Sequence, residues 1–431
     1  MKEGYKKTEV GVIPEDWNVV EFFDIVSKTI DFRGRTPKKL GFEWGNGDIL
    51  ALSANNVKMG KIDFNIENYF ASEELYNKWM CGNELSKGDI LMTMEAPLGN
   101  VTLVPDDRKY ILSQRVIALK TQININNKFI MYLLMSDFIQ NQLNLLSTGT
   151  TAKGINQKNL SKVRLIIPPF KEQKKIAEIL STVDCQIDDT EKLIEKCEEL
   201  KKGLMQRLLS RGIGHSEFKK SEVGEIPASW EVKKLGEITK KIQDGNYGNS
   251  YPKNEEFIED GVPFITSAAI GDSKKINEDK IKYISINKHM ELSKAHVEID
   301  DVLFTNRGAN SGEVALVTKK YDGGNIGPQL TLLRSDKNII ISKYLFYYLQ
   351  SNMMIKQFNM NDGGSAMNFF SISTTKSFKI SYPNLEEQNK IAEILSSVDN
   401  EIEEYRNKKE NLEELKKGLM QQLLAGKIRT I

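Results

Sequence analysis

The residue types that most often perform catalysis or bind metal ions are sparse in this chain. Among its 431 residues there are only three histidines and three cysteines. They do not fall at the short spacings of zinc sites, and three cysteines are too few for a disulfide framework. No glycine-rich phosphate loop or dinucleotide fingerprint occurs. We therefore predict no metal site and no catalytic residue, and we expect Cys185 and Cys197 to be buried or to lie in a helix seam.

One short motif comes close to a catalytic pattern. Ile167-Pro168-Pro169-Phe170 is similar to the Asn-Pro-Pro-Tyr/Phe box with which DNA methyltransferases act on amino groups. That chemistry needs an Asn or Asp side chain to accept a hydrogen bond from the target amine, and Ile167 occupies that position here. We interpret the motif as a strand end followed by a proline break before a helix.

The composition limits the class of protein and of partner. Hydrophobic residues make up 40% of the chain and charged residues 28%, and the net charge is +1. The length predicts two to four domains, and the absence of a long apolar run predicts no membrane span. The few cysteines favour the cytoplasm. Because no segment has a basic excess, binding to nucleic acid would need charge patterned in space or supplied by a partner.

The strongest pattern is an internal repeat. Glu9 to Trp17 recurs as Glu222 to Trp230, and the run that begins Glu172-Gln173 recurs from Glu387-Gln388. Across residues 172–213 and 387–428, about 25 of 42 positions are identical. Each half of the chain thus holds a variable region of roughly 170 residues followed by a well-matched segment. A period above 200 residues indicates a duplicated domain.

The matched segments have apolar residues at alternating spacings of four and three, which is typical of a coiled coil. Chain order favours antiparallel pairing of the two helices, each about 60 Å long at 1.5 Å per residue. Lys201 and Lys416 interrupt the seam, so we predict that they fix the register or meet another subunit. The expected seam residues are Ile176, Leu180, Val183, Ile187, Ile194, Leu204, Leu208, Ile391, Leu395, Val398, Ile402, Leu412, Leu419 and Leu423.

The variable regions contain both strand and helix patterns. Val101 to Val104, Val116 to Leu119 and Val163 to Ile167 predict strands. Lys128 to Leu146 and Ser342 to Phe358 predict helices. The predicted class is therefore α+β.

Taken together, these motifs resemble the specificity subunits of type I restriction–modification enzymes. The resemblance rests on Gly11-x-Ile13-Pro14-x-x-Trp17 and its copy at Gly224 to Trp230. It rests further on Pro168-Pro169-x-x-Glu172-Gln173-x-Lys175-Ile176-Ala177, on the copy from Glu387, and on the Leu-Lys-Lys-Gly-Leu-Met-Gln end of both helices. It covers essentially the whole chain.

The resemblance implies two globular target-recognition domains joined by two long antiparallel coiled-coil helices, with pseudo-twofold duplication. The implied domains are residues 1–170 and 214–384, and the helical spacers are residues 171–213 and 385–431. It also implies double-stranded DNA as ligand, read at a bipartite, asymmetric target. The implied partners are two methylation subunits, which carry S-adenosylmethionine, and through them the restriction subunits. No cofactor is expected in this chain.

Candidate DNA contacts in the first region lie in polar loops. Arg33 to Lys39 is a compact basic loop, in which arginine suits guanine and lysine suits phosphate. The loops around Asn55 and Thr150 resemble family positions near DNA. The predicted contacts are Arg33, Arg35, Lys38, Lys39, Asn55, Asn56, Lys58, Thr150 and Lys153.

Candidate contacts in the second region are mostly amides, which suit adenine in the major groove, and short hydroxyl side chains near phosphate. The predicted contacts are Asn246, Tyr247, Lys253, Asn306, Arg307, Asn310, Ser365 and Asn368. The second copy differs from the first around Thr148-Gly149-Thr150, so contacts do not transfer directly between the copies.

Two alternatives remain open from the sequence. One is an enzyme with unfamiliar motifs, and the other is a protein–protein scaffold with two variable adaptor domains on a coiled-coil rod. Exposed helix faces and the Gly-x-Ile-Pro-x-x-Trp segments are candidate docking sites for methylation subunits. Trp17 and Trp230 are alternatively core residues.

Overall fold

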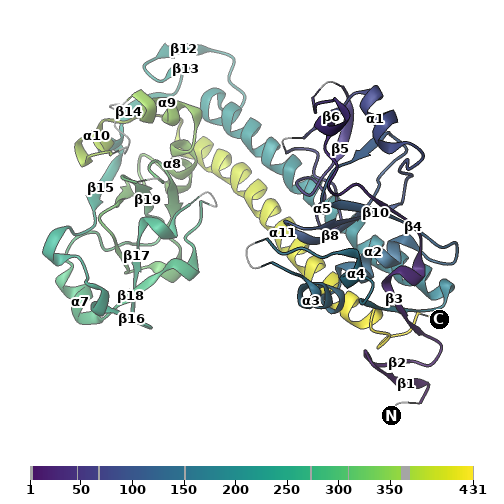
Figure 1. Cartoon of the computed structure of the whole chain (residues 1–431). Helices are drawn as coiled ribbons and strands as arrows, with labels where there is room; N and C mark the ends of the chain where they lie inside the picture. The colour runs from purple at the N-terminus through teal and green to yellow at the C-terminus, as the bar shows by residue number, and fades with distance from the viewer. Residues whose placement is uncertain are drawn as a thin grey trace. The chain divides into compact units, whose positions relative to one another are not determined.

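A computed structural model describes residues 3–45, 47–66, 68–149, 152–271, 274–308, 310–360 and 369–430. The chain divides into two compact units. Unit 1 comprises residues 1–191 and 407–431, and unit 2 comprises residues 192–406. Both divisions fall inside the two long helices, α5 (Phe170–Arg211) and α11 (Leu385–Leu423), drawn in teal and in yellow in Figure 1. The division into two globular domains and two helical spacers, given above from the sequence, differs from this one and stays a prediction.

Unit 1 is built on a four-stranded antiparallel sheet with the order β4–β10–β7–β8. The strands of a second, three-stranded sheet, β6–β5–β9, come from between those of the first sheet in the sequence, and β11 pairs with β3. β1 and β2 form a hairpin before the sheets. The strands are β1 (Tyr5–Thr8), β2 (Gly11–Pro14), β3 (Asn18–Glu21), β4 (Val26–Asp31), β5 (Ile49–Leu52), β6 (Phe70–Ala71), β7 (Ile90–Met94), β8 (Leu98–Leu103), β9 (Tyr110–Leu112), β10 (Val116–Thr121) and β11 (Arg164–Ile167). The helices before α5 are η1 (Phe22–Ile25), η2 (Pro37–Leu40), α1 (Glu73–Met80), α2 (Asn127–Met135), α3 (Asp137–Leu146) and α4 (Gln157–Leu160).

Unit 2 repeats this plan with a sheet of order β15–β22–β19–β20, a second sheet β16–β18–β17–β21, the pair β14–β23 and the hairpin β12–β13. Its strands are β12 (Phe218–Ser221), β13 (Gly224–Pro227), β14 (Glu231–Lys234), β15 (Thr239–Asp244), β16 (Phe257–Ile258), β17 (Val262–Ile265), β18 (Lys282–Ile284), β19 (Val302–Thr305), β20 (Val314–Leu316), β21 (Asn325–Ile326), β22 (Leu330–Ser335) and β23 (Lys379–Tyr382). Its helices before α11 are α6 (Leu235–Ile238), η3 (Gly248–Ser250), η4 (Asn254–Glu256), η5 (Ser267–Ala269), η6 (Glu278–Lys280), α7 (Ile286–Glu291), η7 (Lys319–Tyr321), α8 (Ser342–Leu349), α9 (Asn352–Met360) and α10 (Ile372–Ser377).

The mixed helix and strand content agrees with the predicted α+β class, and the three predicted strands lie in β8, β10 and β11. Each predicted helix in the variable regions is instead two helices. Ser136 ends α2 and begins α3, where its hydroxyl accepts a hydrogen bond from the Ile139 amide. Ser351 lies at the matching break between α8 and α9. A serine that caps a new helix stops the preceding one although the apolar period continues.

The ends of the long helices belong to the cores of the units. In unit 1, Ile176 and Leu180 of α5 pack with Leu423 of α11 and with the sheet and α2. In unit 2, Leu208 of α5 packs with Ile391 of α11 and with the corresponding elements. Within each unit the two helices are therefore held by the hydrophobic core of the unit as well as by each other.

The predicted seam positions face inward in both units. Nine of them are buried and the other five are partly buried, which is compatible with the heptad assignment, and the seam itself stays a prediction. Cys197 packs with Val398 and Ile402 as predicted. The prediction for Cys185 is wrong, because this residue is exposed: it follows Asp184 and points away from the seam.

Glycines mark the long helices in two different ways. Gly212 follows α5 with φ +62°, and Gly426 follows α11 with φ +65°. A Cβ at Gly426 would lie 2.6 Å from Pro14 Cδ, so this position requires glycine. In contrast, a Cβ at Gly203 or at Gly418, inside the helices, would meet no atom within 4 Å. α11 ends at Leu423, before the end of the repeat.

None of the helices in the described ranges is long and apolar enough to cross a membrane.

Candidate nucleic-acid interface

The ends of neighbouring strands lie together at the same end of the main sheet in each unit. In unit 1, Asp31 at the end of β4 pairs with Ile117 of β10, and Thr93 near the end of β7 pairs with Val116. In unit 2, Asp244 pairs with Thr331 of β22 in the same way. We call these surfaces edge 1, formed by residues 31–39, 94–97, 113–115 and 152–157, and edge 2, formed by residues 244–247, 306–308, 327–329 and 369–371. The two repeats therefore have equivalent surfaces at the same end of their main sheets, and these surfaces carry most of the predicted DNA contacts.

Arg33 at edge 1 is held by its own chain. Its Nη2 lies 2.6 Å from Asp31 Oδ2, and its Nη1 donates to the Ile155 carbonyl at 3.1 Å. Gln157 Nε2 also donates to Asp31 at 2.8 Å. Burial of Asp31 raises its pKa, but the hydrogen bonds from Arg33 and Gln157 outweigh this and hold the pKa below its usual value. Arg33 thus fixes the end of β4 against the 152–157 segment.

The other basic residues of the loop are exposed. The Arg35 guanidinium lies 5.1 Å from the centre of the Phe32 ring, and the Arg35 carbonyl accepts a hydrogen bond from Gln114. Lys39 Nζ donates to the Gly34 carbonyl at 2.7 Å, whereas Lys38 is exposed on η2. Arg35, Lys38 and Lys39 are therefore placed to meet an external anion. Lys153 is also exposed, and Thr150 lies outside the described residues.

The predicted contacts after β5 differ in access. Asn56 is 1% exposed; its amide donates to the Ala51 carbonyl and to Asn68 Oδ1, both at 2.8 Å, and its Oδ1 accepts from the Ser53 amide. Asn55 is exposed and Lys58 is partly buried. We therefore assign Asn56 a supporting role in its loop and keep Asn55 and Lys58 as predicted contacts.

Edge 2 rests on a buried polar network around Asp244. Thr331 Oγ1 donates to Asp244 Oδ1 at 2.5 Å, and Asn306 Nδ2 donates to the same oxygen at 3.2 Å. Tyr247 OH donates to Asp244 Oδ2 at 3.0 Å. Because Asn306 is fully buried, this residue supports the edge from beneath and does not reach an external base.

An exposed group of side chains lies over this network. The Arg307 guanidinium is 4.3 Å from the centre of the Phe369 ring, and Phe369 and Tyr247 are each about half exposed. Burial and the nearby Asp244 carboxylate raise the pKa of Tyr247 to about 12, so its phenol keeps its proton at neutral pH. A guanidinium held on an aromatic face offers its in-plane donors outward, as guanine recognition requires. The sequence did not point to Phe369.

The remaining candidates of the second region differ in their surroundings. Asn246 is partly buried, and Lys253 is exposed at the start of η4. Asn310 is exposed but donates to the Ile270 carbonyl at 2.9 Å. Ser365 and Asn368 lie outside the described residues.

Edge 1 contains a pair that the sequence did not reveal, Glu95 and Arg115, with Nε 3.2 Å from Oε1. When the two repeats are aligned so that Thr93 matches Thr305, Glu95 matches Arg307. This match was the one feature of the sequence that could have pointed to Glu95. Among the described residues no cluster of three His, Cys, Asp or Glu side chains could hold a metal ion.

The lysines that interrupt the seam bind to the opposite helix. Lys416 Nζ lies 2.6 Å from Asp184 in unit 1, and Lys201 Nζ lies 2.6 Å from Asp399 in unit 2. Each aspartate also accepts a hydrogen bond from a tyrosine outside the long helices, Tyr132 of α2 in unit 1 and Tyr347 of α8 in unit 2. Burial and the neighbouring aspartate raise the pKa of both tyrosines. These triads fix the helix register and connect both helices to the sheet domain. Fixing the register is the first of the two roles predicted for these lysines.

The tryptophans of the repeated Gly-x-Ile-Pro-x-x-Trp segments are core residues, since both are fully buried. Trp17 Nε1 donates to Glu172 Oε2 at 2.9 Å, and Arg429 Nε donates to Glu172 Oε1 at 2.8 Å. In unit 2, Glu387 instead lies 2.9 Å from His215 Nε2. The glutamate of the repeated Glu-Gln pair is therefore an anchor at the start of each long helix.

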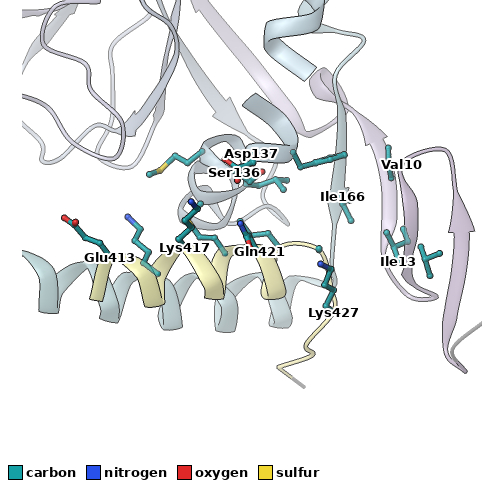
Figure 2. A pocket seen from close by; sticks show the side chains of 17 residues that line it. Val10, Ile13, Ser136, Asp137, Ile166, Glu413, Lys417, Gln421 and Lys427 are labelled. Atoms are coloured by element: carbon teal, nitrogen blue, oxygen red, sulfur yellow. Dashed lines mark hydrogen bonds between the residues drawn. The ribbon is translucent and has the colours of Figure 1, made fainter. Parts of the chain in front are cut away.

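A cleft opens beside the far end of α11 in unit 1. It measures about 530 Å³ and lies between α11, the β1–β2 hairpin and the α2–α3 junction (Figure 2). Lys417, Met420 and Gln421 line it from α11, opposite Ser136. Unit 2 has a smaller cleft of about 170 Å³ at the equivalent place, lined by Lys202, Met205, Gln206 and Ser351, among others. The identical Leu-Lys-Lys-Gly-Leu-Met-Gln runs thus line the same cleft twice.

Comparison with known proteins gives a consistent result. The model of the family described as "Type I restriction modification DNA specificity domain" matches residues 14–199 and again residues 227–414. The putative type I restriction enzyme MjaX specificity subunit of Methanocaldococcus jannaschii is 32% identical over 99% of this chain and 97% of its own length. The MjaVIII specificity subunit of the same organism is also 32% identical, over 99% of this chain and 96% of its own length.

Solved structures have the same fold at lower identity. The S subunit of a type I restriction–modification system from M. genitalium aligns with a TM-score of 0.57 at 17% identity, over 94% of this chain and 96% of its own. A chain from a structure titled for complex assembly and conformational transition of the type I R-M system aligns with a TM-score of 0.54 at 18% identity, over 96% and 99% of the two chains. The double match confirms the duplication inferred from the repeat.

Proposed function

Because this chain belongs to the type I restriction–modification DNA specificity family, we propose that it is the DNA-recognition subunit of such a complex. Its two edges read the two halves of a bipartite target, and the chain performs no chemical step itself. The observation that carries this proposal is the occurrence of edge 1 and edge 2 at equivalent sheet ends of two units with different exposed side chains. Different readers on a repeated scaffold give an asymmetric target.

The direct contacts proposed at edge 1 are Arg35, Lys38, Lys39 and Lys153, with Asn55 and Lys58 in the neighbouring loop. At edge 2 they are Tyr247 and Arg307, with Asn246, Lys253 and Asn310 around them. Thr150, Ser365 and Asn368 stay predictions from the sequence. Arg33 and Asn56 support their loops in this proposal because their polar groups are bound within the chain. Asn306 does so because it is fully buried and its amide nitrogen donates to Asp244.

The proposed partners are two copies of a methylation subunit, and through them the restriction subunits. The methylation subunit would bind S-adenosylmethionine. We place one copy at each of the two clefts beside the helix ends, since the same motif lines both. Lys417 and Lys202 are exposed at these clefts, so we expect an apolar segment of the methylation subunit that carries acidic residues.

The decisive experiment for the function is single-molecule sequencing of methylated adenines in cells that express this chain with its methylation subunit. We expect methylation confined to one bipartite, asymmetric sequence. Methylation without any such sequence, or S-adenosylmethionine binding by the isolated chain in calorimetry, would contradict the proposal.

The docking proposal has a separate test. Native mass spectrometry should show two methylation subunits on the wild-type chain, one on Lys417→Glu and none on the Lys202→Glu/Lys417→Glu double variant. Lys408→Glu is the matched control, because Lys408 is exposed on α11 but does not line the cleft. Retention of both subunits by the double variant would place the docking surface elsewhere.

The long helices are proposed to set the gap between the half-sites. Adding one heptad to both helices, between their triads, should change the number of base pairs in the gap while leaving both half-sites as they were. An unchanged gap in an active complex would contradict this role.

A further inference from the structure

Glu95 and Arg307 occupy the same place in the two units. Each follows the central strand of its main sheet, and each forms a bridge to the segment that leads to the last strand of its unit, Glu95 to Gly154 and Arg307 to Phe369. The residue before each of them makes the same kind of backbone hydrogen bond to the neighbouring strand. The Met94 amide donates to the Arg115 carbonyl at 2.7 Å, and the Asn306 amide donates to the Gln329 carbonyl at 2.9 Å. One place thus carries a carboxylate in unit 1 and a guanidinium in unit 2.

The carboxylate in unit 1 is paired with a second edge residue. Arg115 Nε lies 3.2 Å from Glu95 Oε1, and the side chains are 53% and 49% exposed. Arg115 has φ +68°, a conformation that costs a side chain-bearing residue roughly 1 kcal/mol. An exposed ion pair contributes only about 0–1 kcal/mol to stability. The pair therefore contributes little to the stability of the fold, although Arg115 has a strained backbone conformation at this place.

The free atoms of the pair are complementary to a base pair. Among the described residues no second ion-pair partner is found for Arg115 or for Glu95, and both side chains are about half exposed. In the major groove guanine presents the acceptors N7 and O6, and its cytosine presents the N4 donor beside them. A guanidinium and an adjoining carboxylate offer donors and an acceptor in the same order.

We propose that Glu95 and Arg115 form a base-reading pair that recognises one G·C base pair in the half-site of unit 1. Arg115 donates to guanine N7 and O6, and Glu95 accepts from cytosine N4 while it keeps the guanidinium in position. Arg307, held by Phe369, offers donors alone at the matching place of edge 2. This inference rests on the proposed function and adds the base pair that edge 1 selects.

The test compares the methylated sequence of the wild-type complex with those of two variants. Arg115→Gly removes the donors and suits the left-handed backbone, and Glu95→Gln removes the carboxylate with little change of shape. Each should lower discrimination on the order of tenfold at a single G·C position of one half-site. The other half-site should stay as it is. Arg108→Ala is the matched control, because it removes another exposed ion pair of unit 1, with Asp106, outside edge 1.

The outcomes separate the inference from the proposed function. A wild-type complex with no bipartite sequence contradicts the function itself. Active variants whose half-site is unchanged overturn the base-reading pair and leave the function intact. If Arg115→Gly abolishes methylation through loss of folding, seen as a lowered Tm, the Glu95→Gln sequence decides alone, and an unchanged half-site there overturns the pair.

Discussion

The two units keep equivalent contacts where the long helices meet the sheets and differ where the strands end. Both units contain the Lys–Asp–Tyr triad with an ion pair of 2.6 Å. At the edges, one place carries Glu95 beside Arg115 and the other carries Arg307 over Phe369. The shared contacts have to hold one geometry for both units, whereas the edges face outward and are free to change.

The helix anchors are intermediate between these extremes. Glu172 is fully buried and binds Arg429 and Trp17, and hydrogen bonding to Glu172 raises the pKa of Arg429. Glu387 binds His215, and the indole nitrogen of Trp230 has no partner among the described residues. The same anchor is thus built with an arginine in unit 1 and a histidine in unit 2.

Removing the two anchors should show this difference most strongly. Glu172→Ala leaves Arg429 without its main partner and should cost about 3 kcal/mol of unfolding free energy. Glu387→Ala should cost about 1–2 kcal/mol, because it removes hydrogen bonds from a less buried group. Urea unfolding of both variants measures the values. Equal losses would show that the two anchors are energetically the same.

The triads should respond alike in both units. Lys416→Met leaves Asp184 without its ion-pair partner and should cost about 2 kcal/mol in urea unfolding, and Lys201→Met should cost about the same. Lys417→Met is the control, since it removes an exposed lysine from the same turn and should leave stability unchanged. A loss in only one of the two units would break the proposed equivalence.

The edges should respond separately. Arg307→Ala should reduce discrimination about tenfold, or about 1.4 kcal/mol, at one base pair in the half-site of unit 2. Sequencing of methylated sites should find the half-site of unit 1 unchanged. A relaxed unit 1 half-site would mean that the edges do not read independently.

The smallest effect concerns the glycines of the helices. Gly418→Ala adds a methyl group in open space and a better helix former, so the chain should gain roughly 0.5–1 kcal/mol. Gly426→Ala should instead destabilise, because its Cβ would meet Pro14 at a positive φ. Thermal unfolding distinguishes the two. A loss of stability in Gly418→Ala would contradict the open space found around this residue.

The helix pairing was predictable because a heptad pattern reports which residues share a face. The sequence also marked Lys201 and Lys416 as interruptions of the seam, but their aspartate partners come from the other helix and the tyrosines come from a distant sheet domain. The helix break at Ser136 was missed because the apolar period runs through it. Cys185 was misplaced because it lies only two residues from Ile187, a seam position.

The edges were predictable only in part. The basic loop around Arg35 is local in sequence, so its composition identified it. Glu95 and Arg115 meet only because β7 and β10 are paired in register, and no short motif records such a pairing. Burial also decides which polar residues can face a ligand, and Asn56 and Asn306 show that an amide-rich loop includes residues that hold the loop.

The equal spacing of the triads limits how the length of the two long helices can change. Asp184 precedes Lys201 by 17 residues, and Asp399 precedes Lys416 by the same number. An insertion that lengthens one repeat alone would bring one lysine opposite the wrong residue. A change of helix length that keeps both triads paired would therefore have to occur in both repeats.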